Sequence, residues 1–196
     1  MEKINFIKTF IPQGDFREKY EHGGMMVRHL AAVLDEKMGA YECYECTVPI
    51  GEYDEGEIQK AFVEFSAKMD ALKLKQAKAD KIAEITAYDT SSSVNGFMLN
   101  GLLVWLDKST RVGLMNSTTI AKAAGQKTTT LWLGGIKLVV DCDKAIQLLS
   151  ALEMYALECF NVTASHKQAV SELTTIEEVE AYDYKACYPK MLSMSV

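Results

Sequence analysis

Cysteine and histidine are the residues here whose types could support metal or redox chemistry. Cys43 and Cys46 form a Cys-x-x-Cys pair, the spacing of a zinc knuckle or a thiol–disulfide centre. A structural zinc site usually draws its four ligands from two such pairs, and no second pair exists. The segment also has the composition of a strand, in which an offset of three residues sends side chains to opposite faces. We therefore interpret both as reduced, structural thiols and expect no metal or cofactor.

Nucleophilic catalysis would need a serine, a histidine and a carboxylate brought together by the fold. The candidates are the serines at 91–93, His166 and Asp89. The Gly-x-Ser-x-Gly turn that exposes such a serine in many hydrolases does not occur. We interpret His166 instead as a buried histidine, hydrogen-bonded to Asp183 or to a backbone carbonyl. The sequence therefore favours a protein that is not an enzyme.

Arg111 stands out because every other cation after Arg28 is a lysine or a histidine. A planar guanidinium with five donors suits an acceptor held in a fixed place. We expect an internal partner, Asp89 or Asp107, with an interface role as the alternative. The predicted structural polar network consists of Asp89, Arg111, Thr163, His166 and Asp183.

Aromatic and apolar side chains in the N-terminal half are the candidates for protein binding. Tyrosine is favoured in interfaces for its large, stiff, amphipathic surface, although a tyrosine-bearing hairpin can equally pack on its own helix. A seam with alternating steps of four and three residues follows, which predicts a helix lying on its own domain or a self-associating stem. The candidate interface residues are Tyr41, Tyr44, Phe62, Phe65, Met69 and Leu72.

Charge and hydropathy restrict the partners. The 21 basic and 27 acidic residues give a net charge of -6, and no basic face is concentrated enough for nucleic acid. No stretch approaches the ~18 apolar residues of a membrane span. The segment from Met1 to Phe6 lacks the apolar run of a secretory signal. We expect a cytoplasmic protein without nucleic-acid or membrane partners.

The fold class is predicted to be α+β, in four regions. Residues 1–53 are β-rich: the arms 27–35 and 41–48 read as a hairpin, although the first arm also fits a helix. Residues 54–88 predict a long connecting helix, residues 89–189 a C-terminal α+β domain, and residues 190–196 a flexible tail.

The C-terminal domain is predicted to contain two hairpins. Asn100-Gly101 and Gly134-Gly135 lie between apolar, β-prone segments, which is the strongest short signal for a tight hairpin turn. Such turns would pair Leu99 with Leu102 and Leu133 with Ile136. We expect the two hairpins to form one four-stranded antiparallel sheet with a dry face.

Helices are predicted to cover that dry face. One would begin at Asn116 or Ser117 and end before Gly125, and a longer one, about 142–172, would be capped by Asp141. Thr175 followed by Glu178 has the spacing of a capping box for a short last helix.

Several short motifs, in order and at fitting distances, resemble a phage and prophage domain of unknown function that occurs in Bacteroides-type genomes and among phage tail genes. The resemblance covers roughly residues 81–189. It is carried by 87–91 (Ala-Tyr-Asp-Thr-Ser), 94–97 (Val-Asn-Gly-Phe), 105–107 (Trp-Leu-Asp), 130–132 (Thr-Leu-Trp), 153–156 (Glu-Met-Tyr-Ala), Thr163, His166, 182–183 (Tyr-Asp) and 188–189 (Tyr-Pro).

The resemblance implies a phage context and brings no catalytic residues with it. By weaker association it implies a role in assembly or as a virion accessory, with tail or fibre subunits or a second copy of the chain as partners. The protein would then reside in the host bacterial cytoplasm or in the virion, and a homo-oligomer is expected. The alternatives are a phage-encoded regulator or host-factor binder and, third, an enzyme.

Overall fold

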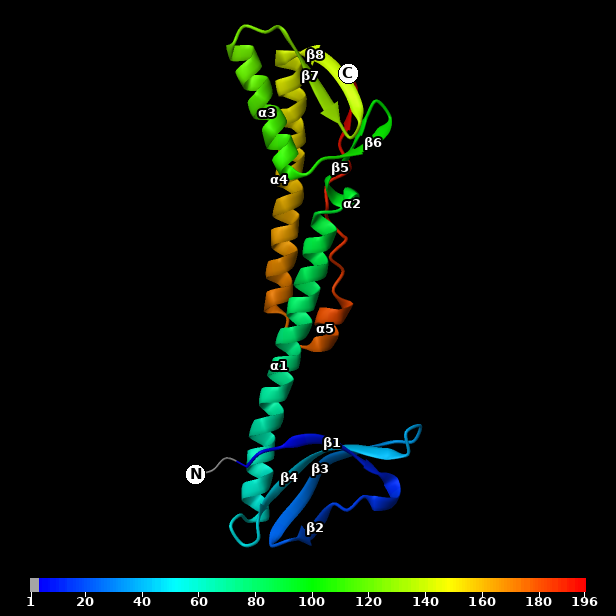
Figure 1. Ribbon diagram of the computed structural model, residues 1–196, viewed down its shortest axis with the longest axis vertical. Coiled ribbons are helices and arrows are strands. Elements are labelled where there is room, and N and C mark those ends of the chain that lie inside the picture. Colours follow the sequence, from blue (N-terminus) through cyan, green and yellow to red (C-terminus); the bar gives the residue numbers. More distant parts are fainter. Residues whose placement is uncertain (1–3) are drawn as a thin grey trace. The chain divides into compact units, whose positions relative to one another are not determined.

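The computed structural model describes residues 4–196 (Figure 1). The chain divides into two compact units, Met1–Lys73 and Leu74–Val196, and the division falls inside the long helix α1, Glu55–Asp89. The prediction of an N-terminal sheet followed by a long helix is confirmed. Among residues 4–196 no helix is both long and apolar enough to cross a membrane.

The N-terminal unit is built on a four-stranded antiparallel sheet in the order β1-β4-β3-β2. Both arms of the predicted hairpin are strands, which settles the helix alternative for the first arm. The bounds are β1 Ile7–Pro12, β2 Lys19–His22, β3 Met25–Asp35 and β4 Ala40–Pro49, with a short 3-10 helix, η1, at Gln13–Asp15.

The first turns of α1 pack on one face of this sheet. Because strand side chains alternate between faces, Cys46 and Val48 face the helix together with Leu30. They form a core with Ile58 and Phe62 of α1. The helix start is fixed by a reciprocal cap, in which the Glu57 amide donates to Asp54 Oδ1 (2.8 Å) and the Asp54 amide to Glu57 Oε2 (3.0 Å).

The C-terminal unit contains the rest of α1, two hairpins and two further long helices. In chain order its elements are α2 Ser92–Asn95, β5 Gly96–Leu99, β6 Leu102–Trp105, α3 Lys108–Ala123, β7 Thr128–Leu133, β8 Ile136–Asp141, α4 Cys142–Glu172, α5 Ile176–Ala181 and β9 Ser193–Met194.

Both hairpins have the predicted register. Leu99 is opposite Leu102 across β5–β6, and Leu133 is opposite Ile136 across β7–β8. Their corners have positive φ angles, 49° at Asn100 and 81° at Gly101 in the first turn, 57° and 87° at the two glycines of the second. This is the type I′ geometry that the Asn-Gly and Gly-Gly pairs favour.

The prediction of one four-stranded sheet is wrong, because the hairpins belong to separate sheets, β6-β5-β9 and β7-β8. The free edge of β5 is occupied by β9: the Met98 amide donates to the Leu192 carbonyl (2.8 Å) and the Asn100 amide to the Met194 carbonyl (2.9 Å). The stretch 190–196, expected to be a flexible tail, supplies this strand. The hairpins meet through side chains instead; a Cβ on Gly134 would lie 3.0 Å from Val104 Cγ1.

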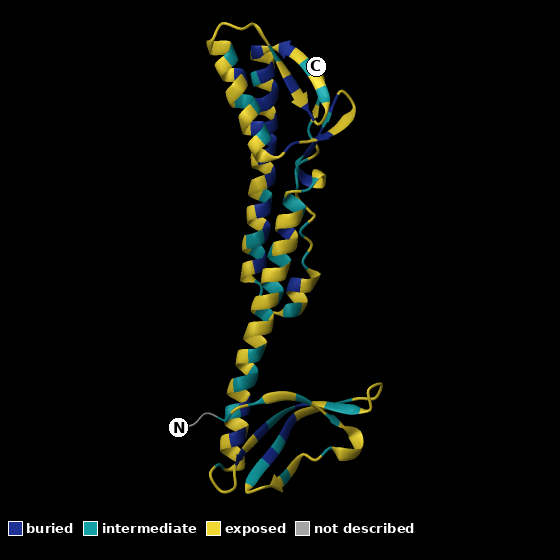
Figure 2. Cartoon of the chain, in the orientation of Figure 1, coloured by how far each residue is buried: buried dark blue, intermediate teal, exposed yellow. Residues whose placement is uncertain are grey.

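Helix α4 buries a continuous stripe against both hairpins, as predicted. It begins where expected, since the Asp141 carboxylate accepts from the amides of Asp143 (2.9 Å) and Lys144 (3.4 Å). Figure 2 shows buried residues along this helix. The stripe and its partners form the largest core cluster, which includes Phe97, Leu99, Leu131, Leu133, Ala145, Leu148, Leu149, Leu152, Tyr155 and Cys159.

Helix α3 is longer than predicted. It begins at Lys108, because the Asp107 side chain caps it and accepts from the Thr110 amide at 2.8 Å. Our prediction placed the start at Asn116 or Ser117, which have the side chains of capping residues, but the helix continues through both and through Gly113. A strong cap and helical neighbours outweigh the roughly 1 kcal/mol that one interior glycine costs. The capping box at Thr175 and Glu178 is confirmed.

The stripe on α4 makes a direct stability prediction. Leu149→Ala removes a side chain that is 1% exposed, so we expect the free energy of unfolding of the C-terminal unit to fall by about 2–5 kcal/mol. Urea titration followed by tryptophan fluorescence measures this, because both tryptophans lie in that unit. The matched control, Leu157→Ala on the same helix, changes a side chain that is 51% exposed and should cost far less. Equal losses for the two variants would contradict the packing described.

Candidate binding site

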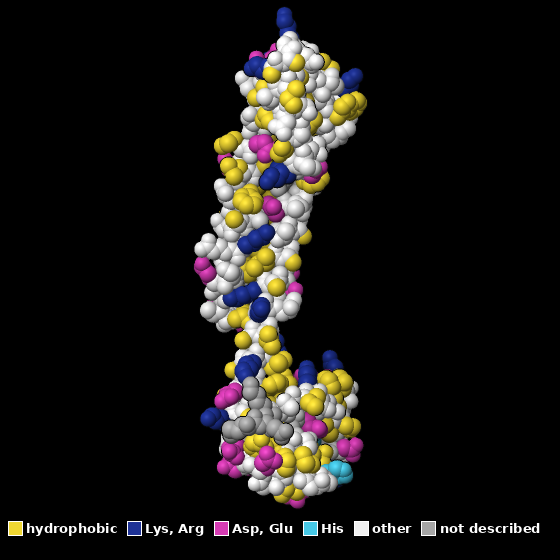
Figure 3. Space-filling model, turned by 60° about the vertical axis from the view of Figure 1, so that its left-hand side comes forward, with side chains coloured by type: hydrophobic (Ala, Val, Ile, Leu, Met, Phe, Trp, Pro, Cys, Tyr) yellow, Lys and Arg dark blue, Asp and Glu magenta, His cyan; other side chains and the backbone are white. Residues whose placement is uncertain are grey.

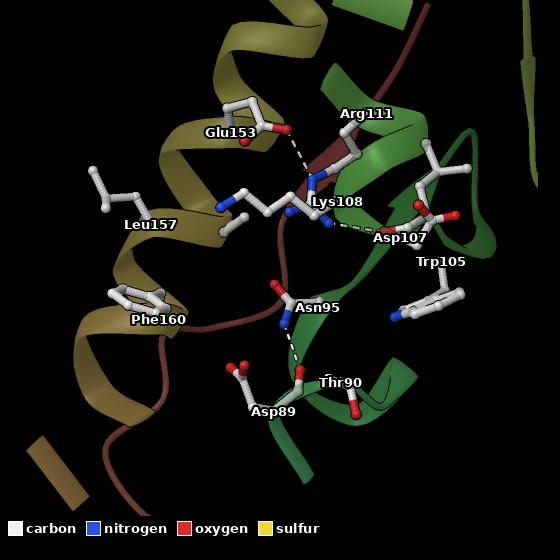
Figure 4. A pocket seen from close by; sticks show the side chains of 12 residues that line it. Asp89, Thr90, Asn95, Trp105, Asp107, Lys108, Arg111, Glu153, Leu157 and Phe160 are labelled. Carbon is white, nitrogen blue, oxygen red and sulfur yellow. Dashed lines mark hydrogen bonds and ion pairs between the residues drawn. The ribbon is translucent and has the colours of Figure 1, made fainter. Parts of the chain in front are cut away.

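A cavity of about 770 Å³ opens on the C-terminal unit (Figure 4). It lies among the end of α1, the end of β6, the first turn of α3 and the middle of α4. Its volume is within the range of known small-ligand and peptide sites. The lining residues are Asp89, Thr90, Asn95, Trp105, Leu106, Asp107, Lys108, Arg111, Glu153, Ala156, Leu157 and Phe160.

The walls of the pocket are apolar and solvent-exposed. Trp105 is 41% exposed, Leu157 51% and Phe160 60%. In Figure 4, Leu157 and Phe160 project from α4 on one side, and Trp105 lies on the other. Glu153, Leu157 and Phe160 follow an i, i+4, i+7 spacing, so they form one row beside the buried stripe of α4. Covering these apolar side chains would remove apolar surface from water, which is favourable. Their grouped exposure therefore indicates a surface that binds another molecule.

Arg111 is the buried cation of the pocket. Its side chain is 9% exposed, its Nε donates to Glu153 Oε1 at 2.9 Å, and its Nη1 donates to the Leu106 carbonyl at 2.8 Å. The expectation of an internal role is met, but the expected aspartate partner is wrong. These bonds join three segments, since α3 is linked to α4 and to Leu106, the residue directly after β6.

The acidic groups around the pocket are engaged by the chain itself. Asp107 accepts hydrogen bonds from Ser109 and Thr110, which hold the pKa of its carboxyl well below the usual range. Glu153 is paired with Arg111. Asp89 Oδ1 accepts from Thr163 Oγ1 at 2.8 Å.

Lys108 is the exception among the charged lining residues. In the described part of the chain no carboxylate lies within ion-pair distance of its Nζ, and the Nζ donates no hydrogen bond. It is the first residue of α3 and lies one turn before Arg111, so both cations project from the same helical face.

Hydrogen bonds fix the floor where α1 meets α2. Asn95 Nδ2 donates to the Asp89 carbonyl at 2.6 Å, and the Ser91 side chain accepts from the Ser93 amide at 3.2 Å. Behind them the Tyr155 hydroxyl donates to the Val94 carbonyl at 2.7 Å, and burial raises the pKa of Tyr155 to about 12. The floor is therefore anchored to α4.

The structure divides the predicted polar network. Thr163 bonds to Asp89 and also accepts from the Tyr188 hydroxyl at 2.8 Å. His166 is buried, its Nε2 donating to the Ala186 carbonyl and its Nδ1 accepting from the Tyr182 hydroxyl, both at 2.9 Å. A backbone carbonyl is thus its partner, as one of our two alternatives held.

The other two residues of the predicted polar network, Asp183 and Arg111, do not bond to Asp89, Thr163 or His166 in the described part of the chain. Asp183 is exposed, and within residues 4–196 the one hydrogen bond that its side chain accepts comes from the Lys185 amide, at 2.9 Å. Arg111 belongs to the pocket. The sequence analysis did not identify four of the lining residues as site residues: Lys108, Glu153, Leu157 and Phe160. The sequence signal that could have identified three of them is the i, i+4, i+7 spacing of 153, 157 and 160.

The candidate interface residues of the N-terminal half pack largely within their own unit. Tyr41 stacks on Phe16 with ring centroids 4.1 Å apart, and Tyr44 meets Phe65 edge-on at 5.2 Å. Phe62 of α1 is buried in the core that this helix forms with the sheet. Met69 is half-buried and Leu72 is 58% exposed.

The Cys-x-x-Cys pair has the disposition expected of structural thiols. Cys43 and Cys46 are both free and buried, and only Cys46 belongs to the core facing α1. Burial raises the pKa of each thiol, which disfavours the reactive thiolate. Over residues 4–196 no group of three or more His, Cys, Asp and Glu side chains is arranged to hold a metal ion.

Comparison with known proteins identifies the family. Residues 76–186 match the family described as Domain of unknown function (DUF4376), so more than half of the chain is covered and the chain belongs to this family. The match spans every residue that lines the pocket. No curated protein and no solved structure matches the chain.

The Arg111–Glu153 pair can be tested through stability. Arg111→Met leaves Glu153 and the Leu106 carbonyl without their donor, so we expect a loss of about 2–4 kcal/mol in the free energy of unfolding. Arg111→Lys should recover only part of it, because an ammonium lacks the fork that reaches both acceptors. Lys108→Gln, one turn away and without a partner, should leave stability within about 0.5 kcal/mol. Urea unfolding followed by tryptophan fluorescence separates the three; an equal loss in Lys108→Gln would refute the assignment.

Proposed function

We propose that this protein is a phage- or prophage-encoded accessory of virion assembly that works by binding another protein through the pocket of its C-terminal unit. A tail or fibre subunit is the proposed partner. The observation that carries the binding role is the ring of exposed apolar side chains, Trp105, Leu157 and Phe160, around a cavity with a charged floor.

This combination is typical of a protein-recognition surface. Interface centres are enriched in tryptophan, phenylalanine and arginine, and aromatic anchors that fill pockets carry much of the binding energy. On the face drawn in Figure 3, acidic and basic side chains are interspersed with apolar ones. A mixed surface of this kind suits a protein partner better than a phosphate backbone, which needs a concentrated positive field.

Binding is favoured over catalysis by how the pocket's charged groups are used. Glu153 neutralises a buried arginine, Asp107 caps a helix and Asp89 accepts from Thr163. A general acid or base must be free to exchange its proton with a substrate. The phage context rests on the ordered motifs from 87–91 to 188–189, which resemble a phage and prophage domain.

The proposal predicts that capture of a virion protein depends on the pocket. Affinity-tagged protein, expressed during infection or prophage induction, is recovered and its partners are compared by mass spectrometry with the proteins of purified virions. Trp105→Ala with Phe160→Ala removes two aromatic anchors, so recovery of the partner should fall at least tenfold.

Trp132→Ala is the matched control, because Trp132 is also exposed (59%) and lies in the same unit but does not line the pocket. It should recover the partner like the unaltered protein. Recovery of host proteins alone, or loss in the control but not in the double variant, would reject the proposal. A partner encoded among early phage genes would favour a regulator instead.

A further inference from the structure

We infer that the pocket binds an internal acidic residue of its partner, an Asp or Glu flanked by an aromatic or aliphatic side chain. This inference deepens the proposed function and rests on it. It names the chemistry of the bound segment: a carboxylate for the cations Lys108 and Arg111 of α3, and an apolar neighbour for the exposed walls.

We infer a carboxylate because hydrogen-bond donors in the pocket have no partner within the chain. Arg111 is more than nine-tenths buried, and its Nε and Nη1 are engaged, but its Nη2 group has no hydrogen-bond partner in the described part of the chain. It is also not among the buried polar atoms sealed from solvent, so it remains accessible. Lys108 Nζ, one turn earlier on α3, is equally unpartnered. In Figure 4 both side chains extend into the space between α3 and α4.

The acidic residues that line the pocket do not occupy these free donors. The pocket holds three carboxylates and two cations, but each carboxylate already has a donor within the chain: Arg111 for Glu153, the α3 cap for Asp107 and Thr163 for Asp89. Lys108 has no such partner in the described part of the chain, and the Nη2 of Arg111 is free beside it, so a carboxylate placed there would gain charge-assisted hydrogen bonds from both.

The apolar neighbour is called for by the walls. Trp105 on one side and Leu157 with Phe160 on the other remain 41–60% exposed, and an inserted aromatic or aliphatic side chain would cover all three. An internal residue is favoured over a chain terminus for two reasons. The free donors are side chains, whereas terminal carboxylates are commonly captured by nests of backbone amides. The exposed rims also leave room for the chain to continue on both sides.

The test is a nuclear magnetic resonance titration of the full ¹⁵N-labelled chain. The sequence has two tryptophans, so the spectrum contains two indole N–H signals, one from Trp105 in the pocket and one from Trp132 outside it. The probes are amino-acetylated, carboxy-amidated peptides Gly-Phe-Glu-Leu-Gly, with Gln or Lys replacing Glu in two others. A fourth peptide, Gly-Gly-Phe-Gln-Leu, ends in a free carboxylate.

The Glu peptide should shift the Trp105 indole and leave Trp132 in place, binding about tenfold more tightly than the Gln peptide and more tightly still than the Lys peptide. Lys108→Gln should reduce the preference for Glu over Gln severalfold, because only the free edge of Arg111 then remains for the carboxylate. Lys137→Gln, opposite Trp132 on the β7–β8 hairpin, should preserve it. Tighter binding of the peptide that ends in a free carboxylate than of the Glu peptide would overturn the inference, because the pocket would then recognise a chain terminus and not an internal acidic residue.

Equal binding of the Glu and Gln peptides, or no shift of Trp105 with any peptide, would overturn the inference. These outcomes are separable from failure of the proposed function. If the Trp105/Phe160 double variant loses a virion protein but Glu and Gln bind alike, the partner is real and its acidic chemistry is wrong. If Glu is preferred but no virion protein is captured, the pocket's chemistry stands and the assembly role falls.

Discussion

The buried stripe of α4 is the constraint on which the rest of the C-terminal unit depends. Two small sheets and α3 have no hydrogen-bonded ladder in common, so they share one core only through side chains that meet on this helix. Its leucines each contribute about 1.5–3 kcal/mol by burial, and Tyr155 adds a bond to the backbone of α2. Without that stripe neither hairpin has a second layer to cover its apolar face.

The pocket follows from how this stripe is used. Helix α4 has one row of side chains toward the hairpins and a second row, Glu153, Leu157 and Phe160, directly beside it. Arg111 ties α3 to that second row through Glu153 and to β6 through the Leu106 carbonyl. The gap between α3 and the end of α1 is therefore lined by exposed apolar side chains and by the two cations of α3, Lys108 and Arg111. Helix α4 thus contributes one face to the core and an adjacent face to the pocket.

Local signals in the sequence predicted much of the fold. The corners at Asn100-Gly101 and Gly134-Gly135, the cap at Asp141 and the capping box at Thr175 each act within a few residues, so their outcome did not depend on distant parts of the chain. The start of α3 was missed although its cap at Asp107 is also a local signal. The prediction of a single sheet failed because strand pairing depends on long-range competition. The edge of β5 was available to either hairpin or tail, and the segment 193–194 occupies it.

The residues of the candidate site were harder to predict from the sequence than the fold was. Arg111 was recognised as unusual, but its partner lies 42 residues away on another helix, and nothing local distinguishes Glu153 from the aspartates beside the first hairpin. The exposed row on α4 looks like an extension of the buried stripe when only periodicity is available. Exposure of Leu157 and Phe160 becomes visible only once the hairpins and α3 are placed.

Site-specific photo-crosslinking tests the central claim, that the pocket is where the partner binds. A benzophenone amino acid replaces Phe160 at the pocket rim or, in a matched sample, Val139, which is 64% exposed on β8 away from the pocket. After irradiation of infected or induced cells, the account predicts a crosslink from position 160 to a virion protein, at an acidic segment. A crosslink that forms from position 139 and not from position 160 would contradict it.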